Sequence, residues 1–232
     1  MAGITTDVLL TGPVQNMSIS SWGYYDIQGQ FKFHIVETVN ESGNSSTLVI
    51  TAFFRKGPNG NGVINDFRGW FTGTVFYQVD GTSTEVTLAN WSESAGNAGL
   101  PDPTMADSEG WRSIGSGGTD TMPWTPWSVT VNVPHNADGT LSMKLGFKAN
   151  GGTNPTLGMQ RADDPSAYMG TYNFNASATT DSVVLTPIAV GGFVYISDGS
   201  AFQKYRPYVW TGSAWVPADP YVWNGSQWVP CA

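Results

Sequence analysis

Residues 127–147 read W-S-V-T-V-N-V-P-H-N-A-D-G-T-L-S-M-K-L-G-F. Apolar and polar residues alternate on both sides of the centre of this stretch, which is the pattern of two half-buried β-strands, over 127–133 and 141–147. Asp138-Gly139 lies between them, and this dipeptide favours a tight turn because both residues tolerate positive φ. The sequence therefore predicts a β-hairpin over residues 127–147.

The same alternation recurs along the chain, and amphipathic helical patterns are essentially absent. Leu48, Ile50, Ala52 and Phe54, for example, are expected to line one face of a strand. Further strands are expected over residues 17–22, 31–37, 47–54, 72–79, 84–88, 167–176 and 182–185, with turns at Gly43-Asn44 and Asp80-Gly81. Many short strands separated by turn signals are typical of β-sandwiches. We therefore predict an all-β domain over residues 1–187, an immunoglobulin-like or jelly-roll β-sandwich.

The composition excludes several classes of protein. Charged residues make up 12% of the chain, about half the usual share, and the net charge is −8. Because phosphate binding needs a basic stripe, we expect no nucleic-acid partner. Cys231 is the single cysteine, so neither an internal disulfide nor a thiolate metal site is expected. The sequence also predicts neither a signal peptide nor insertion into a membrane.

A repeat with a step of thirteen residues occupies the C-terminal end. Its second copy, from Tyr208, reads Y-V-W-T-G-S-A-W-V-P, and its third, from Tyr221, reads Y-V-W-N-G-S-Q-W-V-P. A fixed step indicates one small unit used several times, and we predict three β-hairpin repeats over residues 193–232. The sequence leaves open whether each turn has two or four residues, and therefore whether Trp223 and Trp228 lie opposite each other. Units this small have little core, so we expect them to dock between copies of the chain.

Residues 90–125 interrupt the strand pattern with an irregular insertion. This insertion contains Trp91, Trp111 and Trp124. Long irregular loops are uncommon in a compact domain and often functional. The three rings are therefore candidates for a loop interface, and the alternative is a surface insertion that packs its own tryptophans.

Three stretches resemble a known family, the tail-associated structural proteins of siphophages that infect Firmicutes. Residues 39–51, V-N-E-S-G-N-S-S-T-L-V-I-T, resemble a strand of those proteins. Residues 133–142, V-P-H-N-A-D-G-T-L-S, are similar to their recurrent H-N-A-D-G-T-K-S hairpin, with Leu141 where the family usually has Lys. The terminal Y-V-W-N-G-S-x-W-V repeat is similar to short aromatic repeats that end many phage virion proteins. The insertion has no counterpart. The resemblance implies a β-sandwich virion component and names no catalytic residue.

The histidines and serines show no reactive pattern. His34 and His135 are the two histidines, and nothing in the sequence places them together, so a two-histidine metal site is not expected. No G-x-S-x-G nucleophile motif is present, and residues 114–118, I-G-S-G-G, lack the strand and helix that such a motif needs.

Carboxylates are the other candidates for chemistry. A pair of them could serve glycoside hydrolysis, and an acidic loop such as that around Asp138 could bind calcium. The carboxylates considered are Asp102, Asp107, Glu109, Asp163 and Asp164. Asp164-Pro165 and the residues around Asp138 read as turns, and the other three carboxylates lie in the irregular insertion. We therefore expect no enzyme activity, no catalytic residue, no metal and no cofactor.

The aromatic residues of the repeats are the better functional candidates. They are Tyr208, Trp210, Trp215, Tyr221, Trp223 and Trp228. Exposed rings of this kind stack on sugars or anchor protein interfaces, and the alternative is that they form the internal core of a repeat stack.

Together with the resemblance, these rings favour a non-enzymatic bacteriophage virion protein, either tail-associated or a capsid decoration. Its expected partners are other virion proteins, its own copies and bacterial surface glycans. It would be assembled in the host cytoplasm and exposed on the particle surface. A carbohydrate-binding module or adhesin for cell-wall glycans is the alternative, and a glycan-degrading enzyme is a weaker one.

Overall fold

The computed structural model is all-β, as the alternation predicts. It describes residues 3–19, 23–60, 67–92, 99–100, 106–116, 125–136, 139–150, 154–161, 168–188, 194–197, 199, 202–205, 207–218, 220–223 and 225–230. Every strand pair in these ranges is antiparallel, and the helical element there is one 3₁₀ turn, η1 (Glu41–Gly43).

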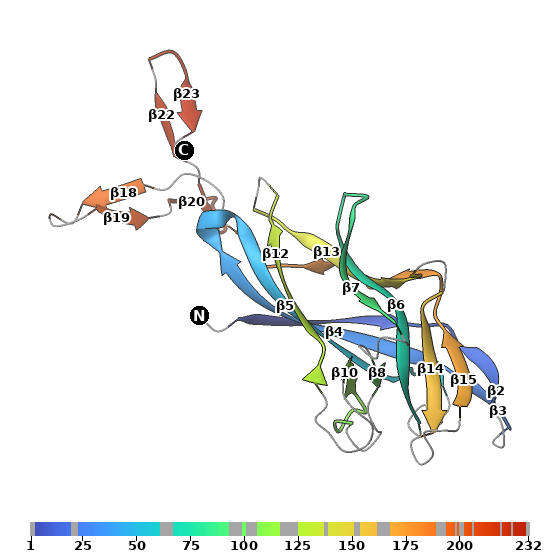
Figure 1. Cartoon of the computed structure of the whole chain (residues 1–232). Coiled ribbons are helices and arrows are strands. Elements are labelled where there is room, and N and C mark those ends of the chain that lie inside the picture. The colour runs from blue at the N-terminus through green and yellow to red at the C-terminus, as the bar shows by residue number, and fades with distance from the viewer. Residues whose placement is uncertain are drawn as a thin grey trace.

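A five-stranded sheet forms one side of the molecule (Figure 1). Its strands, in spatial order, are β1 (Ile4–Thr11), β4 (Gly29–Asn40), β5 (Ser45–Lys56) and β12 (Ser128–Pro134), with β9 (Arg112–Ser113) also paired to β5. The turn between β4 and β5 places Asn44 at a φ of 44°, a left-handed conformation that asparagine tolerates. The predicted turn at Gly43-Asn44 is therefore confirmed.

The second large sheet has ten strands, with β6 (Phe67–Val79) as its central strand. The other strands are β7 (Glu85–Trp91), β8 (Gly99–Leu100), β10 (Gly115–Ser116), β11 (Thr125–Pro126), β13 (Ser142–Lys148), β14 (Thr156–Arg161), β15 (Tyr168–Asn173), β16 (Ser177–Thr179) and β17 (Val183–Val184). Strand β6 pairs with β14 and β8 along its first half and with β13 and β7 along its second. Gly73 stands at the change of partner with a φ of 152°, where a Cβ would run into the ring of Phe147.

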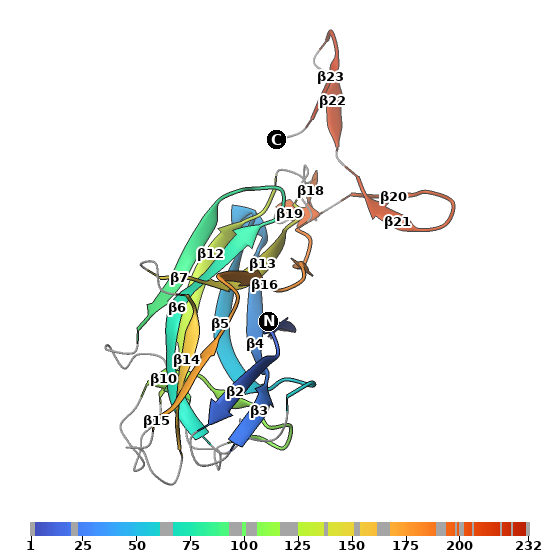
Figure 2. The same ribbon diagram turned by 90° about the vertical axis from the view of Figure 1, so that its right-hand side faces the viewer.

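Four separate hairpins complete the fold. The strands β2 (Gln15–Ile19) and β3 (Gly23–Ile27) pair with each other near the N-terminus. The other three hairpins are β18–β19 (Val194–Ser197 and Phe202–Tyr205), β20–β21 (Tyr208–Trp210 and Trp215–Pro217) and β22–β23 (Tyr221–Trp223 and Trp228–Pro230). Figures 1 and 2 show these three beyond one end of the two large sheets.

The hydrophobic core contains side chains from both large sheets. Phe31 of β4 is fully buried, and its ring centroid lies 5.1–6.4 Å from six other rings. Those rings are Phe33, Phe54, Phe71, Trp91, Phe147 and Phe174. The predicted face of β5 is confirmed, because Leu48, Ile50, Ala52 and Phe54 are each at most 1% exposed.

The predicted hairpin over residues 127–147 is wrong in its pairing, although both strands exist. Strand β12 pairs with β5 in one sheet, and β13 pairs with β6 in the other. Each strand contributes apolar side chains to the same core, and the connection between them runs from one sheet to the other. Alternation fixes which side chains face the core and leaves the choice of neighbouring strand open.

Other strand boundaries differ from the prediction in smaller ways. The expected strand over 17–22 is replaced by the β2–β3 hairpin, which pairs Met17 with Tyr25. The strand expected over 167–176 ends at Asn173, and a separate short strand, β16, follows it. The remaining predicted strands are present with shifted ends, and the turn at Asp80-Gly81 joins β6 to β7 with Gly81 at a φ of 79°.

A buried polar network joins the sheet-to-sheet connection to the segment that precedes the C-terminal hairpins. The Ser46 hydroxyl donates to Glu37 Oε1 (2.6 Å) and lies 2.8 Å from His135 Nε2. His135 Nδ1 lies 2.8 Å from the carbonyl oxygen of Gly139 and therefore carries a proton, because a carbonyl oxygen only accepts. Glu37 Oε2 accepts from both the amide (3.0 Å) and the hydroxyl (2.7 Å) of Thr186. The Glu37 carboxylate thus accepts hydrogen bonds from three donors, one on Ser46 and two on Thr186.

The burial of Tyr172 can be tested through the pH at which its hydroxyl ionises. Its fully buried ring packs edge-on against Phe174, and its hydroxyl donates to the carbonyl oxygen of Pro13 (2.6 Å). Burial raises the pKa of the Tyr172 hydroxyl from 10.0 to about 12. Because this pKa is raised in the folded state, the stability that neutral Tyr172 contributes is complete below pH 10 and is lost as the pH rises towards 12.

We expect the ultraviolet absorbance of phenolate, measured as the difference between the wild-type protein and Tyr172→Phe, to rise near pH 12. The unfolded protein in urea serves as the control and should show a difference signal near the ordinary pKa. A difference signal near pH 10 in the folded protein would contradict the assignment.

Candidate binding site on the C-terminal hairpins

Each C-terminal repeat forms its own hairpin. In the second, Val209 pairs with Val216 and Trp210 pairs with Trp215. The Thr211 amide donates to the carbonyl oxygen of Ala214 (2.9 Å), and the Ala214 amide donates back to Thr211 Oγ1 (3.3 Å). The Thr211 side chain therefore closes the turn that its backbone begins.

The described residues of the three turns share two features, the glycine conformation and the spacing of the paired strands. Gly199, Gly212 and Gly225 have φ values of 95°, 96° and 98°, a region that residues with a side chain rarely adopt. In each hairpin four residues separate the last paired residues, so Trp223 lies directly opposite Trp228. The thirteen-residue step in the sequence thus corresponds to one strand register and one glycine conformation, each found three times.

The register brings the indoles of each pair together. In the second hairpin, backbone bonds join Thr211 to Ala214 and Pro207 to Ala218. Because bonded and non-bonded pairs alternate along antiparallel strands, Trp210 and Trp215 form a non-bonded pair, in which side chains approach most closely. Their ring centroids are 5.6 Å apart, and those of Trp223 and Trp228 are 5.7 Å apart. Such cross-strand aromatic pairs stabilise a hairpin.

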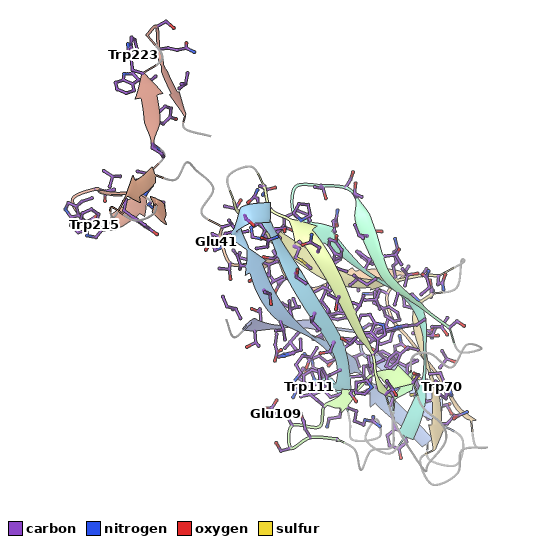
Figure 3. The ribbon with its side chains drawn as sticks, turned by 60° about the vertical axis from the view of Figure 1, so that its left-hand side comes forward. Glu41, Trp70, Glu109, Trp111, Trp215 and Trp223 are labelled. Atoms are coloured by element: carbon purple, nitrogen blue, oxygen red, sulfur yellow. The ribbon has the colours of Figure 1, made fainter. Side chains whose placement is uncertain are left out.

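The same rings are exposed. The exposed fractions are 54% for Tyr208, 50% for Trp210, 67% for Trp215, 53% for Tyr221, 52% for Trp223 and 66% for Trp228. In the single chain, these rings do not form the internal core of a repeat stack, which was one of the two interpretations of the sequence. Figure 3 shows Trp215 and Trp223 on hairpins that lie away from the two large sheets. Each indole packs on its partner and leaves the rest of its surface to solvent.

The surface of the last two hairpins carries almost no charged residues. Between residues 207 and 230 the sequence has one charged residue, Asp219. Flat apolar rings therefore lie beside small polar groups at the turns, such as the hydroxyls of Thr211 and Ser213, which lie 3.4 Å apart. This combination suits a neutral ligand that offers both an apolar face and hydroxyl groups.

The tryptophans of the insertion differ from those of the hairpins. Trp91 is 1% exposed and packs on Phe147 (5.6 Å) and Trp127 (5.3 Å) in the core. Trp111 is 3% exposed and lies beneath the side chains of Arg55 and Lys32. The structure corrects the expectation of a loop interface at these two residues, because buried rings offer a partner no surface. Trp124 lies outside the described residues.

The insertion contributes to both large sheets. Its strand β9 pairs with β5, while β8 and β10 belong to the ten-stranded sheet. Ile114, which lies between β9 and β10 in the sequence, is fully buried, and its amide donates to the carbonyl oxygen of Ala52 (2.9 Å). The insertion thus covers one edge of the core with its own side chains.

The titratable side chains are spread over the molecule. His34 contacts Asp7 (2.6 Å) at the surface, whereas His135 is buried beside Ser46. Asp107 Oδ1 accepts from the amides of Glu109 and Trp111 (both 2.9 Å) and so shapes a turn. Asp102, Asp138, Asp163 and Asp164 lie outside the described residues.

The described part of the chain contains neither a cluster of metal ligands nor a membrane-spanning helix. No three His, Cys, Asp or Glu side chains there are close enough together to hold a metal ion. No helix in the same residues has the length and apolar character needed to cross a membrane.

Sequence reasoning missed two groups of residues. The network of Glu37, Ser46 and His135 has no signal in the alternation, because its members come from three separate segments. The stacking of Arg55 on Trp111 was equally hidden, since the two residues lie far apart in the sequence. A signal that could have been noticed is the presence of a charged Glu37 on the core-facing side of its strand, where alternation requires an apolar residue.

Comparisons with protein-family models, with curated proteins and with solved structures each found no match. The function proposed for the chain therefore depends on the chain's own residues.

Proposed function

We propose that this chain is a non-enzymatic structural component of a bacteriophage particle, which contacts neutral glycans of the bacterial surface through its C-terminal hairpins. The observation that carries the proposal is the pair of half-exposed indoles on each of the last two hairpins. Repeated, uncharged ring pairs suit a polymer that repeats the same sugar face along its length. Binding of linked sites to one polymer multiplies weak single contacts into useful avidity.

The fold supports the structural part of this proposal. Rings from both large sheets meet in one core, as in the contact of Phe31 with Phe71 (5.2 Å). We propose that the two sheets form a β-sandwich, of immunoglobulin-like or jelly-roll type, which attaches the chain to the particle. Particles purified from a lysate should then contain the chain, in the tail or on the capsid. A protein that neither assembles nor copurifies with particles would contradict this part.

Binding to isolated bacterial cell walls tests the glycan contact. Trp215→Ala and Trp228→Ala each remove one ring of a pair. The double variant is expected to lose at least about thirtyfold in apparent affinity, as for an interface residue worth roughly 2 kcal/mol. The matched control is Val209→Thr, on the opposite face of the second hairpin, which should bind as the wild type does. Unchanged binding in the double variant would overturn the proposal.

Two further measurements separate loss of the binding surface from loss of the hairpin. Trp215→Phe keeps an aromatic pair and should retain part of the binding. The circular dichroism of coupled indoles reports whether each hairpin still forms. A carbohydrate-binding module or adhesin that works outside a particle would use the same rings, and it is favoured if cell-wall binding holds while the chain is missing from purified particles.

A further inference from the structure

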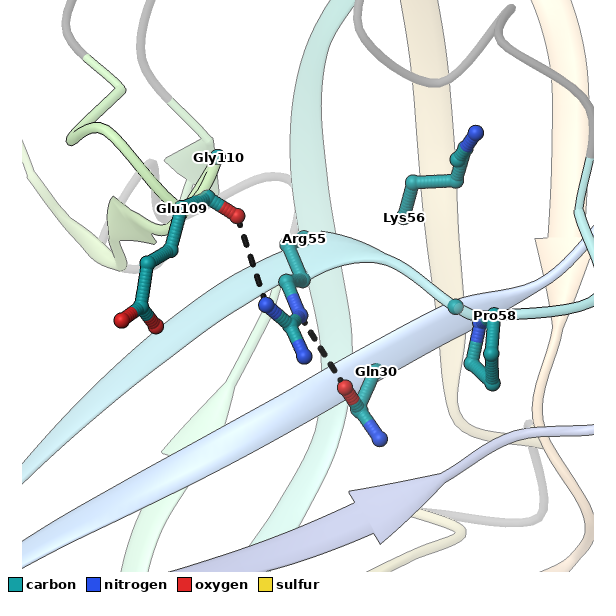
Figure 4. Close-up of a pocket in the computed structure, with 7 residues that line it drawn as sticks. Gln30, Arg55, Lys56, Pro58, Glu109 and Gly110 are labelled. Carbon is teal, nitrogen blue, oxygen red and sulfur yellow. Dashed lines mark hydrogen bonds between the residues drawn. The ribbon is translucent and has the colours of Figure 1, made fainter.

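A small pocket lies at the end of β5, on the side of the five-stranded sheet that carries Trp111. Its volume is about 280 Å³. The residues around it include Gln30, Arg55, Lys56, Pro58, Glu109 and Gly110 (Figure 4). They come from β4, from the end of β5 and the turn after it, and from the insertion, so the pocket forms only when the insertion packs on the sheet.

The guanidinium group of Arg55 is fixed in this pocket from three directions. It lies over the Trp111 ring, 4.2 Å from the ring centre. Its Nε donates to Gln30 Oε1 (3.1 Å), and its Nη1 donates to the backbone carbonyl oxygen of Glu109 (3.3 Å). Gln30 is 6% exposed and is itself held by a bond from its Nε2 to Thr11 Oγ1 (2.8 Å). The orientation of the guanidinium is therefore set before any ligand arrives.

Arg55 has no carboxylate partner among the described residues. Glu109 is the nearest acid in the pocket, but Figure 4 shows its backbone carbonyl, and not its carboxylate, turned towards Arg55. That carboxylate accepts instead from Trp111 Nε1 (3.2 Å). Arginine has five N–H donors, and the two bonds from Arg55 leave three of them for a ligand. Lys56, whose ammonium forms no ion pair with a described residue, adds a second positive charge.

We propose that this pocket binds the carboxylate group of a small ligand, of the size of one acidic sugar. A planar guanidinium matches a carboxylate through two parallel N–H···O bonds. The pocket lies below the range of roughly 300–1,000 Å³ that is typical of sites for drug-sized ligands, so the ligand is small. The net charge of −8 opposes a polyanion, so a single negative charge suits the site best.

Carboxylate binding in this pocket does not depend on glycan binding by the hairpins, so the two proposals can fail separately. The test is an NMR titration of the full-length protein with D-glucuronate, with D-glucose and inorganic phosphate as comparison probes. We expect glucuronate to shift the amide signals of Gly57 and Gly110 with a Kd on the order of 1 mM. Glucose is expected to leave these signals unchanged. Phosphate is expected to bind at least several-fold more weakly.

Arg55→Lys keeps the positive charge and removes the planar group, and it should weaken glucuronate binding at least about tenfold. Lys56→Met, which leaves the stacked arginine in place, should weaken it a few-fold. The control Lys144→Met removes a cation from a strand of the other sheet and should change nothing. The proposal is overturned if glucuronate causes no shift, if glucose or phosphate binds as tightly, or if both pocket variants bind like the wild type.

Discussion

Phe31→Ala should lower the free energy of unfolding by about 3–5 kcal/mol, the range for removal of a fully buried phenylalanine ring. The ring is 0% exposed and touches aromatic side chains from both large sheets, including Phe54 of β5 and Phe147 of β13. Its loss leaves a cavity at the point where the sheets meet, and six neighbouring rings cannot all move to fill it. Since domains are stable by only about 5–15 kcal/mol, much of the total would be lost.

Urea unfolding followed by circular dichroism measures this effect. The matched control is Phe53→Ala, which removes the same ring from the opposite face of the five-stranded sheet. Phe53 is only partly buried, beneath the ammonium of Lys32 (5.0 Å), and its removal should cost clearly less. Equal losses for the two variants would show that the core does not lie where the structure places it.

A comparable loss, about 3–5 kcal/mol, is expected for Glu37→Ala, because it removes the acceptor of three hydrogen bonds. Glu37 is 4% exposed, and its carboxylate accepts from the Ser46 hydroxyl and from both donors of Thr186. Alanine would leave these three donors without their acceptor, at a cost of about 1–3 kcal/mol for each one that stays buried. Water entering the space would lower that cost, which keeps the sum within the stated range.

Two comparisons separate this network from an ordinary surface charge. Glu37→Gln retains one oxygen acceptor and nearly the same shape, so its loss should be smaller, about 1–2 kcal/mol. Glu85→Ala, which breaks a partly exposed contact with Lys148, should cost at most about 1 kcal/mol. Hydrogen exchange adds a local signal, because the Thr186 amide should exchange faster in Glu37→Ala. An unchanged Thr186 exchange rate, or a loss below that of Glu85→Ala, would contradict the network.

Local patterns in the sequence predicted well where the strands lie and which of their faces is buried. They predicted poorly which strands pair with each other. The alternation at Leu48, Ile50 and Phe54 identified the buried side of β5, because each residue's direction follows from its position alone. The predicted pairing of β12 with β13 was wrong, since a turn sequence after His135 fits a hairpin and a crossing between sheets equally well. Which of these forms depends on strands that lie far away in the chain.

For the aromatic residues, too, the sequence predicted position along the chain but not the surroundings in the fold. The thirteen-residue step located the C-terminal rings, yet the register that places Trp210 opposite Trp215 became clear only from the backbone bonds. Trp111 gave no hint of its environment, since Arg55 and Lys32 cover it from strands more than fifty positions earlier. Long-range contacts of this kind decide which tryptophan is buried and which is displayed.

The self-contained hairpins have an evolutionary consequence. Thirteen consecutive residues supply both strands, the turn and the indole pair of one unit, so a duplicated or deleted segment adds or removes a whole unit without disturbing the core. In-frame recombination between nearly identical copies is therefore a ready route to chains with more or fewer units. Under the proposed function, we expect selection to tune the strength of binding through copy number faster than through substitutions within any one unit.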